Sequence, residues 1–361
     1  MIHLKRIALS LCLLSCICRL SAQRKTENLL LIGWDGVRWQ EIFTGVDSSL
    51  MNDPAFTKRP GGMRIQFWND TVEVRRKKLF PFFWSVLSRD GQLYGNRTIG
   101  NKVDVANPYN ITGPGFTETL VGFGDTAVKS NNKIYNNNTN VLEFINNRKE
   151  YKGEVAVFAM SNLFDYILNK PRTGLMISCD TDRVNRPDKE FQLLNDMQQV
   201  APKPFGERAD LLTYFQAKEY LKIYHPKVMY LEMGETDDWA HAGSYDFYVS
   251  TLHSQEAMIA ELWDYIQSMP QYKDKTTLLI ACDHGRGAQI KNQWTGHGPQ
   301  IKDSKDIFIL AMGPDMPALG EVKTPTQLYQ GQMAATIASF LGLKYEAQHP
   351  ILPVITTMFN K

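Results

Sequence analysis

Five short runs of apolar residues constrain the fold of this chain more than any other feature of its sequence. Apart from a polar residue at one end of most of them, the runs are continuously apolar and do not alternate with polar residues, which is typical of strands buried on both faces of a mostly parallel sheet. Segments with helical periodicity separate the runs, so we predict an α/β fold of three layers, an α/β/α sandwich. The predicted strands are 28–33, 154–159, 228–232, 277–282 and 307–312, and the predicted helices are 79–87, 140–147, 209–224, 244–268 and 327–341.

The rest of the chain gives no sign of a second domain. No Pro-, Ser- or Gly-rich linker and no block of like charge divides it, and 43% hydrophobic residues in 361 supply ample material for one large core. We predict a single domain over 23–361 with surface insertions, and loops at the Asn-, Pro- and Asp-rich stretches 48–75, 125–140 and 180–207. The formal net charge of +2 gives no nucleic-acid-binding signature.

The first 22 residues are organised like an export signal. A basic pair at 5–6 precedes an apolar run at 7–17 that is too short to span a membrane, and an acceptable cleavage site ends at Ala22. We predict that 1–22 is a signal peptide and that the mature protein is periplasmic or extracellular. The sequence LLSC, which ends at Cys16, leaves lipoprotein anchoring open, and no later apolar run is long enough for a transmembrane helix.

Three carboxylates follow predicted strands directly or closely: Asp35, Asp237 and Asp283. In open parallel sheets, ligands bind at the edge where the carboxyl ends of the strands meet. We therefore expect these three side chains to converge at that edge.

Three of the seven histidines accompany these carboxylates. His241 follows Asp237 by four residues, His284 is next to Asp283, and His297 lies between two glycines, where the backbone can approach a metal closely. Each residue alone also fits an ordinary surface role. Together they favour a metal centre, and the mixture of imidazole and carboxylate favours Zn²⁺ over Mg²⁺ or Ca²⁺.

Thr112 stands before a Gly-Pro-Gly sequence and a helix predicted from about Pro114. A hydroxyl there lies near free backbone N–H groups and the positive end of the helix dipole, which suits a phosphate. The alternative is a threonine that only caps the helix.

The four segments IGWDGVRWQ, ITGPGFTETLVG, GETDDWAHAG and ACDHGRG…TGHGP occur in an order that resembles the alkaline phosphatase superfamily. The chain is most similar to its nucleotide pyrophosphatase/phosphodiesterase-like and bacterial secreted phosphatase branches. Thr112, Pro114 and Gly122 match the superfamily's nucleophile motif at its spacing. The resemblance implies two zinc ions, one held by Asp237, His241 and His297 and the other by Asp35, Asp283 and His284, with Thr112 touching the second.

The resemblance also implies the activity. The protein is expected to hydrolyse phosphomonoesters or phosphodiesters of small organic molecules through a phospho-threonine at Thr112. Asn131 resembles an asparagine that donates to a phosphate oxygen, although Asn132 is an equal chemical candidate. Lys170 and Arg172 resemble a basic pair that some monoesterases direct at the phosphate, although they fit a solvated basic loop as well.

Two alternative functions remain open. One is a sulfatase-like or phosphonate-cleaving relative, but sulfatases need Cys or Ser as the nucleophile and a basic residue four positions later, where this chain has Thr112 and Phe116. The other is a non-catalytic surface protein that binds ligands on the same scaffold. The complete set of predicted metal ligands argues against the second alternative.

Overall fold

The structure is a computed structural model that describes residues 24–360. The predicted signal peptide and Cys16 therefore lie outside the described residues. Among the described residues, none of the helices is both long enough and apolar enough to cross a membrane.

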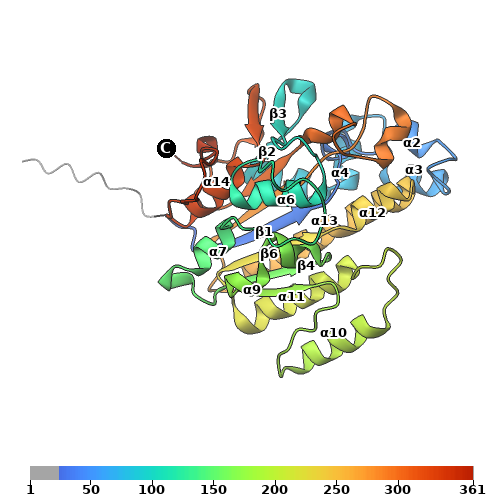
Figure 1. The fold of residues 1–361 in the computed structure, drawn as a ribbon. Helices are drawn as coiled ribbons and strands as arrows, with labels where there is room; N and C mark the ends of the chain where they lie inside the picture. Colours follow the sequence, from blue (N-terminus) through green and yellow to red (C-terminus); the bar gives the residue numbers. More distant parts are fainter. Residues whose placement is uncertain (1–23, 361) are drawn as a thin grey trace, which may run out of the picture.

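An eight-stranded sheet forms the middle of the molecule, in the order β10-β2-β9-β7-β1-β6-β4-β5 (Figure 1). The five strands from β7 to β5 are parallel, whereas β9 is antiparallel to both β7 and β2. Every residue of β1, β4, β6 and β7 is buried, as the continuous apolar runs predict. The strands are β1 (Asn28–Trp34), β2 (Gly91–Tyr94), β4 (Val155–Ala159), β5 (Met176–Cys179), β6 (Val228–Met233), β7 (Thr276–Cys282), β9 (Ile309–Met312) and β10 (Gly320–Glu321).

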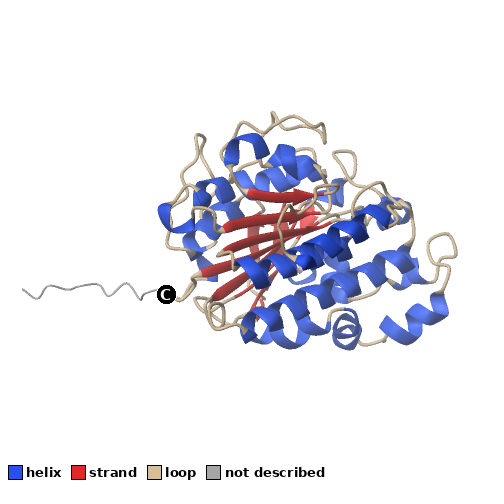
Figure 2. Ribbon diagram, turned by 90° about the horizontal axis from the view of Figure 1, so that it is seen from below, coloured by secondary structure: helices blue, strands red, loops and turns tan. Residues whose placement is uncertain are grey.

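Helices cover both faces of this sheet, which confirms the predicted α/β class (Figure 2). α6 packs on α14, and α11 packs on β4 and β6. The α-helices are α1 (Trp39–Thr44), α2 (Ser48–Met51), α3 (Pro60–Phe67), α4 (Val72–Leu79), α5 (Ser88–Asp90), α6 (Thr112–Val121), α7 (Val141–Asn146), α8 (Leu163–Ile167), α9 (Lys170–Thr173), α10 (Lys189–Val200), α11 (Asp210–Tyr224), α12 (Glu235–His241), α13 (Tyr245–Ser268) and α14 (Gln332–Phe340).

Several predicted boundaries are wrong. The first part of the helix predicted at 327–341 is a strand, β11 (Thr326–Tyr329), which pairs with β3 (Asn101–Asp104) in a second sheet completed by β8 (Asp306–Ile307). The stretch 48–75 contains α2, α3 and the start of α4, and 180–207 contains α10. The helices in 48–75 are short, and the apolar face of α10, with Phe191 and Leu194, is hidden in the composition of the stretch by the polar residues around it. The helix predicted at 79–87 is present but lies over 81–90, and its middle part, Phe83–Leu87, is π-helical. The loop predicted at 125–140 is confirmed.

Candidate metal centre

The carboxyl ends of three neighbouring strands bring the three predicted carboxylates together. Trp34, the last residue of β1, is in register with the last residues of β6 and β7. Asp35 and Asp283 therefore leave the sheet at the same level, and Asp237 follows from α12, which begins shortly after β6. This convergence is the one that the sequence predicts.

One group consists of Asp35, Asp283 and His284, whose ligand atoms all lie within 4.8 Å of one another. His284 Nε2 is 3.3 Å from Asp35 Oδ1 and 3.2 Å from Asp283 Oδ2. Thr112 Oγ1, at the start of α6, is 3.5 Å from the same nitrogen. The predicted nucleophile Thr112 thus lies next to the group formed by Asp35, Asp283 and His284, as the resemblance implies.

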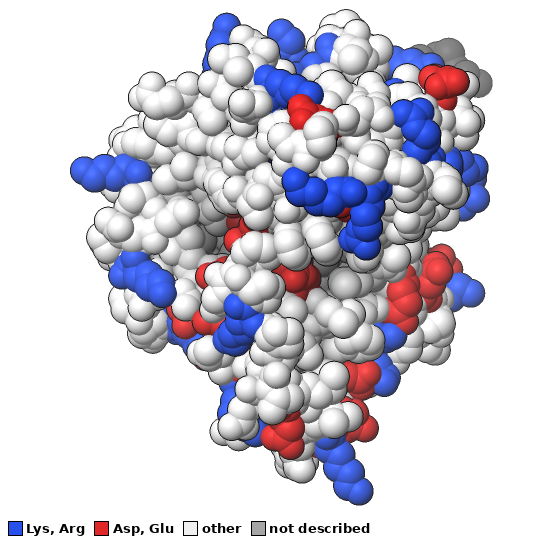
Figure 3. Space-filling view, turned by 90° about the vertical axis from the view of Figure 1, so that its right-hand side faces the viewer, with Lys and Arg blue, Asp and Glu red and all other residues white. Residues whose placement is uncertain are grey.

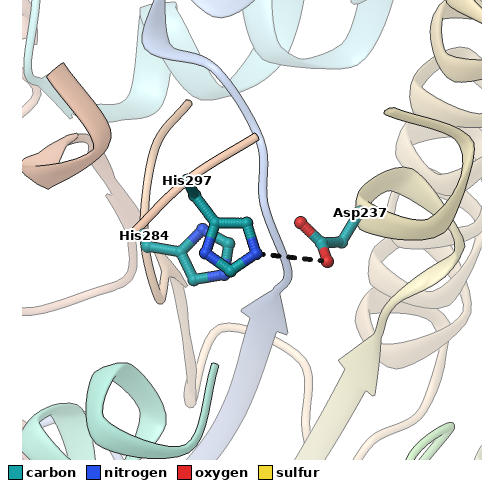
Figure 4. A group of neighbouring side chains, drawn as sticks. All are labelled: Asp237, His284 and His297. Carbon is teal, nitrogen blue, oxygen red and sulfur yellow. Dashed lines mark ion pairs between the residues drawn. The ribbon is translucent and has the colours of Figure 1, made fainter. Parts of the chain in front are cut away.

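A second group adjoins the first and contains Asp237, His284 and His297 (Figure 4). The carboxylate of Asp237 points toward the two imidazoles, with Oδ2 at 3.9 Å from His297 Nε2. The rings of His284 and His297 stack with centroids 3.7 Å apart, so His284 belongs to both groups. His241 Nε2 lies 3.0 Å from Asp237 Oδ2 and 3.0 Å from His297 Nε2.

Hydrogen bonds fix the tautomers of two of these histidines. Nδ1 of His297 lies 3.0 Å from the carbonyl oxygen of Asn110, and Nδ1 of His284 lies 3.1 Å from that of Gly285. A carbonyl oxygen only accepts, so Nδ1 carries the proton and Nε2 keeps a lone pair toward the carboxylates. Burial, together with the neighbouring His284, lowers the pKa of His297 to about 3, so its imidazole is neutral.

His241 differs from the other two histidines in its tautomer and in its exposure to solvent. Its Nδ1 lies 3.3 Å from a guanidinium nitrogen of Arg286, which only donates, so in this arrangement Nε2 carries the proton and donates to Asp237. Its side chain is also 47% exposed. The structure thus brings His241 into contact with the group but does not direct a lone pair at it, and its role as a ligand stays a prediction.

The residues of both groups fit divalent cations. Asp35 Oδ1 and Asp283 Oδ2 are buried without a hydrogen-bond partner, and each faces the lone pair of His284 Nε2. Two ligand atoms of a tetrahedral Zn²⁺, each roughly 2.0–2.2 Å from the ion, lie about 3.3–3.5 Å apart, close to the separations seen here. Burial, followed by the charge of a neighbouring carboxylate, raises the pKa of both Asp35 and Asp283 well above the usual range. A bound cation would remove this repulsion.

Arg286, which is not among the predicted site residues, forms hydrogen bonds with two of the segments that build the site. It is fully buried and pairs with Asp237 Oδ1, while its other guanidinium nitrogens donate to the carbonyls of Trp294 at 2.8 Å and Thr295 at 2.6 Å. Burial alone would raise the pKa of Asp237, but the Arg286 charge lowers it well below the usual range. A side chain at Gly36 would collide with Arg286 and Asp237, so that glycine leaves room for the pair.

A cavity of about 300 Å³ opens beside Thr112 and is lined by Asp35, Thr112, Asn131 and Lys133, among others. Asn131 Oδ1 accepts from the backbone N–H of Gly113 at 2.7 Å, which leaves its NH₂ group for a ligand. Asn132, the alternative candidate, lines a different cavity.

Lys170 and Arg172 do not line the Thr112 cavity. In α9, Lys170 pairs with Asp165 at 3.0 Å and Asp182 at 2.5 Å. Arg172 pairs with Glu143 at 2.7 Å and donates to three backbone carbonyls of the 136–138 loop. Both cations are therefore engaged with other groups, and the structure does not bring them to Thr112. Lys133, whose position gave no recognisable signal in the sequence, is the basic residue that lines the cavity instead.

Comparison by sequence finds no relatives: no family model and no curated protein matches the chain. Comparison by structure finds many. The wild-type alkaline phosphatase PafA superposes with a TM-score of 0.61 at 10% identity, over 93% of this chain and 99% of that one. The lipoteichoic acid synthase LtaP from Listeria monocytogenes superposes with a TM-score of 0.57 at 12% identity, over 89% of this chain and 73% of that one. A 2-O GAG sulfatase superposes with a TM-score of 0.57 at 14% identity, over 92% of this chain and 74% of that one.

The layers and the edge site define an α/β/α sandwich with a carboxylate–imidazole centre at the carboxyl ends of its parallel strands. Among such proteins, this chain has the fold of the alkaline phosphatase superfamily, as the resemblance of its four segments predicts.

Proposed function

We propose that the protein is a two-metal hydrolase of phosphoric esters that reacts through Thr112. The observation that carries the proposal is the position of the Thr112 hydroxyl, 3.5 Å from a histidine that belongs to both candidate metal groups. Asp35, Asp283 and His284 would hold one ion, and Asp237, His297 and His241 the other, most consistently as Zn²⁺. When bound, the two ions would supply positive charge to the phosphoryl group and lower the pKa of a hydroxyl at the centre.

The chain's own groups then have separate tasks. Thr112 Oγ1 attacks phosphorus, the ester oxygen leaves as an alcohol, and water releases phosphate from the threonine in a second displacement. Asn131 is held by Gly113 so that its NH₂ can donate to a phosphate oxygen. Lys133 adds a positive charge on the same cavity wall.

The direct test compares Thr112→Ala with Thr112→Ser and the wild type after loading with Zn²⁺. We expect Thr112→Ala to lose at least about a thousandfold in the hydrolysis of 4-nitrophenyl phosphate or its diester, because the nucleophile is gone. Thr112→Ser should keep measurable turnover. Metal content should be equal in all three, and mass spectrometry of acid-quenched wild type should find a phosphoryl group on the Thr112 peptide. Full activity in Thr112→Ala would refute the assignment.

A second candidate is sulfate ester hydrolysis, which the structural similarity to a 2-O GAG sulfatase favours. Thr112 and the buried Phe116 stand where sulfatases need Cys or Ser and a basic residue, which favours phosphate. The rates on 4-nitrophenyl phosphate, its diester and 4-nitrophenyl sulfate in one sample decide between the two. If no ester is turned over and fewer than two metal ions bind tightly, the protein is a binding protein on this scaffold.

We further propose, from residues 1–22, that the protein is exported. Fractionation of cells, with the N-terminal sequence of the mature protein, tests this; an intact Met1 in the cytoplasm would refute it. Labelling with a radioactive fatty acid would distinguish anchoring at Cys16.

A further inference from the structure

Three acidic side chains that are not predicted metal ligands line the cavity beside Thr112: Glu207, Glu232 and Asp238. Figure 3, which faces the right-hand side of Figure 1, shows acidic groups inside the hollowed middle of this face and Lys and Arg around it. Glu232 is the most confined of the three. It belongs to β6, is 1% exposed, and its Oε2 accepts from the N–H of Met160 at 2.8 Å.

Glu207, Glu232 and Asp238 form what we call the acidic wall of the cavity, and two of its carboxylate oxygens accept no hydrogen bond. Glu232 Oε1 and Asp238 Oδ2 are both buried without a hydrogen-bond partner, while Glu207 accepts from the hydroxyl of Ser161 at 2.8 Å. Among the described residues that line the cavity, Lys133 is the single basic one, and it lies exposed on the 125–140 loop. A buried carboxylate oxygen without a partner is costly, so a cation bound beside these two oxygens would offset that cost.

The spacing of the three acids indicates what kind of cation fits. Within the described part of the chain, the groups of three side chains with ligand atoms mutually within 4.8 Å do not include Glu207, Glu232 or Asp238. The three are therefore spread too widely to surround one bare ion together, whereas a cavity of about 300 Å³ accepts an organic cation. The hydroxyl of Ser161 and the amide of Asn162 line the same wall and can accept from its N–H groups.

We propose that this wall is a subsite for an ammonium group carried by the alcohol that leaves, so that the preferred substrates are phosphoric esters of amino alcohols. The inference rests on the proposed function. Thr112 would take the phosphoryl group, the C–O oxygen would leave with the amino alcohol, and Glu232 and Asp238 would bind its ammonium group.

The test uses two ligands of matched size, 2-aminoethyl phosphate and propyl phosphate, in which an ammonium replaces a methyl group. Their Kd values are measured by calorimetry on Zn²⁺-loaded Thr112→Ala, which needs no turnover. We expect the amino ligand to bind about 10- to 100-fold more tightly, the range that one or two hydrogen bonds to a charged group supply. On active wild type, the kcat/KM ratio of the two monoesters, in which the amino alcohol or propanol is the leaving group, should show the same preference.

In Glu232→Gln and Asp238→Asn, each made in the Thr112→Ala background, the ratio of the two Kd values should fall toward one. Asp196→Asn, which changes an exposed acid paired with Arg183, is the matched control and should keep the ratio. Equal binding of both ligands to the unaltered wall would overturn the inference. So would a third tightly bound divalent metal ion that Glu232→Gln removes, because the wall would then be a metal site. If aryl esters are hydrolysed but the ratio is one, the subsite alone is wrong; if no ester is hydrolysed but the ratio holds, the proposed function alone is wrong.

Discussion

At the level of single residues, Arg286 links three segments of the chain that meet at the candidate centre. Its own loop carries Asp283 and His284, its guanidinium pairs with Asp237 of α12, and it donates to two carbonyls just before His297. A planar fork with five N–H donors can make these contacts together, whereas an ammonium cannot. Arg286 therefore positions candidate ligands without being one of them.

We predict that Arg286→Met, and to a lesser degree Arg286→Lys, weakens metal binding at the Asp237 group by about 10- to 100-fold, as loss of outer partners does in other metal sites. Titration with Co²⁺ should report this in the visible absorption of one of the two sites. Arg183→Met, at an exposed arginine, is the control. Unchanged Co²⁺ affinity at both sites would mean that Arg286 serves folding only.

The predicted ligands and nucleophile were accessible from the sequence because their signals are local, with a carboxylate at a strand end, a histidine beside it, and Thr112 before Gly-Pro-Gly. The acidic wall could not be predicted from the sequence, because Glu207, Glu232 and Asp238 line one cavity only in the folded protein. A signal did exist for Glu232, which interrupts the apolar strand VMYLEM with a charge. Lys170 and Arg172 show the opposite case, because a sequence pair gives no information about the carboxylates that the fold places beside it.

At the level of elements, the approach of α6 to the end of β7 sets the position of Thr112. α6 begins at Thr112 and ends at Val121, where it is capped by Gly122, whose φ of 91° suits a glycine. Gly115, in its first turn, lies against the strand end so closely that a Cβ there would be 2.4 Å from the carbonyl oxygen of Asp283. The helix can approach only because this residue has no side chain.

We predict that Gly115→Ala destabilises the protein by about 1–3 kcal/mol, the cost of overpacking a buried contact, and reduces metal binding by Asp283. Gly61→Ala in α3 is the matched control, because nothing lies within 4 Å of its Cβ and alanine favours helix by up to about 1 kcal/mol. Urea unfolding and metal analysis measure both effects. Equal stability of the two variants would contradict the close approach.

The sequence predicts the bounds of a strand well where both faces of the strand are buried. β1, β4, β6 and β7 were found within about a residue of their ends because continuous apolar runs of that length are typical of strands in the middle of a parallel sheet. The sequence predicts helix at β11 because the strand that pairs with it, β3, lies more than two hundred residues away. Tertiary pairing decides such short segments, and no local pattern reveals it.

At the level of the whole molecule, buried carboxyls make stability depend on pH. Glu256 of α13 is not among the candidate metal ligands and accepts from the N–H groups of Phe82 at 2.6 Å and Phe83 at 3.0 Å. Burial raises its pKa to about 7 from the usual 4.5. The native state then holds a proton that the unfolded chain releases, so stability falls as pH rises from about 4.5 to about 7 and stays lower above it, by at most about 3 kcal/mol.

We predict that Glu256→Gln, which cannot ionise, flattens this part of the profile. The fall in unfolding midpoint between about pH 5 and pH 8 should be smaller in the variant than in the wild type, with both proteins free of metal. Glu346→Gln changes an exposed glutamate and should leave the profile as it is. Parallel profiles for wild type and Glu256→Gln would contradict the raised pKa.

Of the strands in the described part of the chain, β1 is the first to be synthesised, yet it gains its two neighbours late. β1 ends at Trp34, but its two neighbours begin only at Val228 and Thr276, and the final histidine of the centre is His297. While the ribosome makes the intervening residues, β1 has no strand to pair with and Asp35 has no partner with which to hold an ion. A partly made chain therefore lacks the complete candidate centre. If the centre takes up metal ions as we propose, they would bind only after the chain has been made as far as His297.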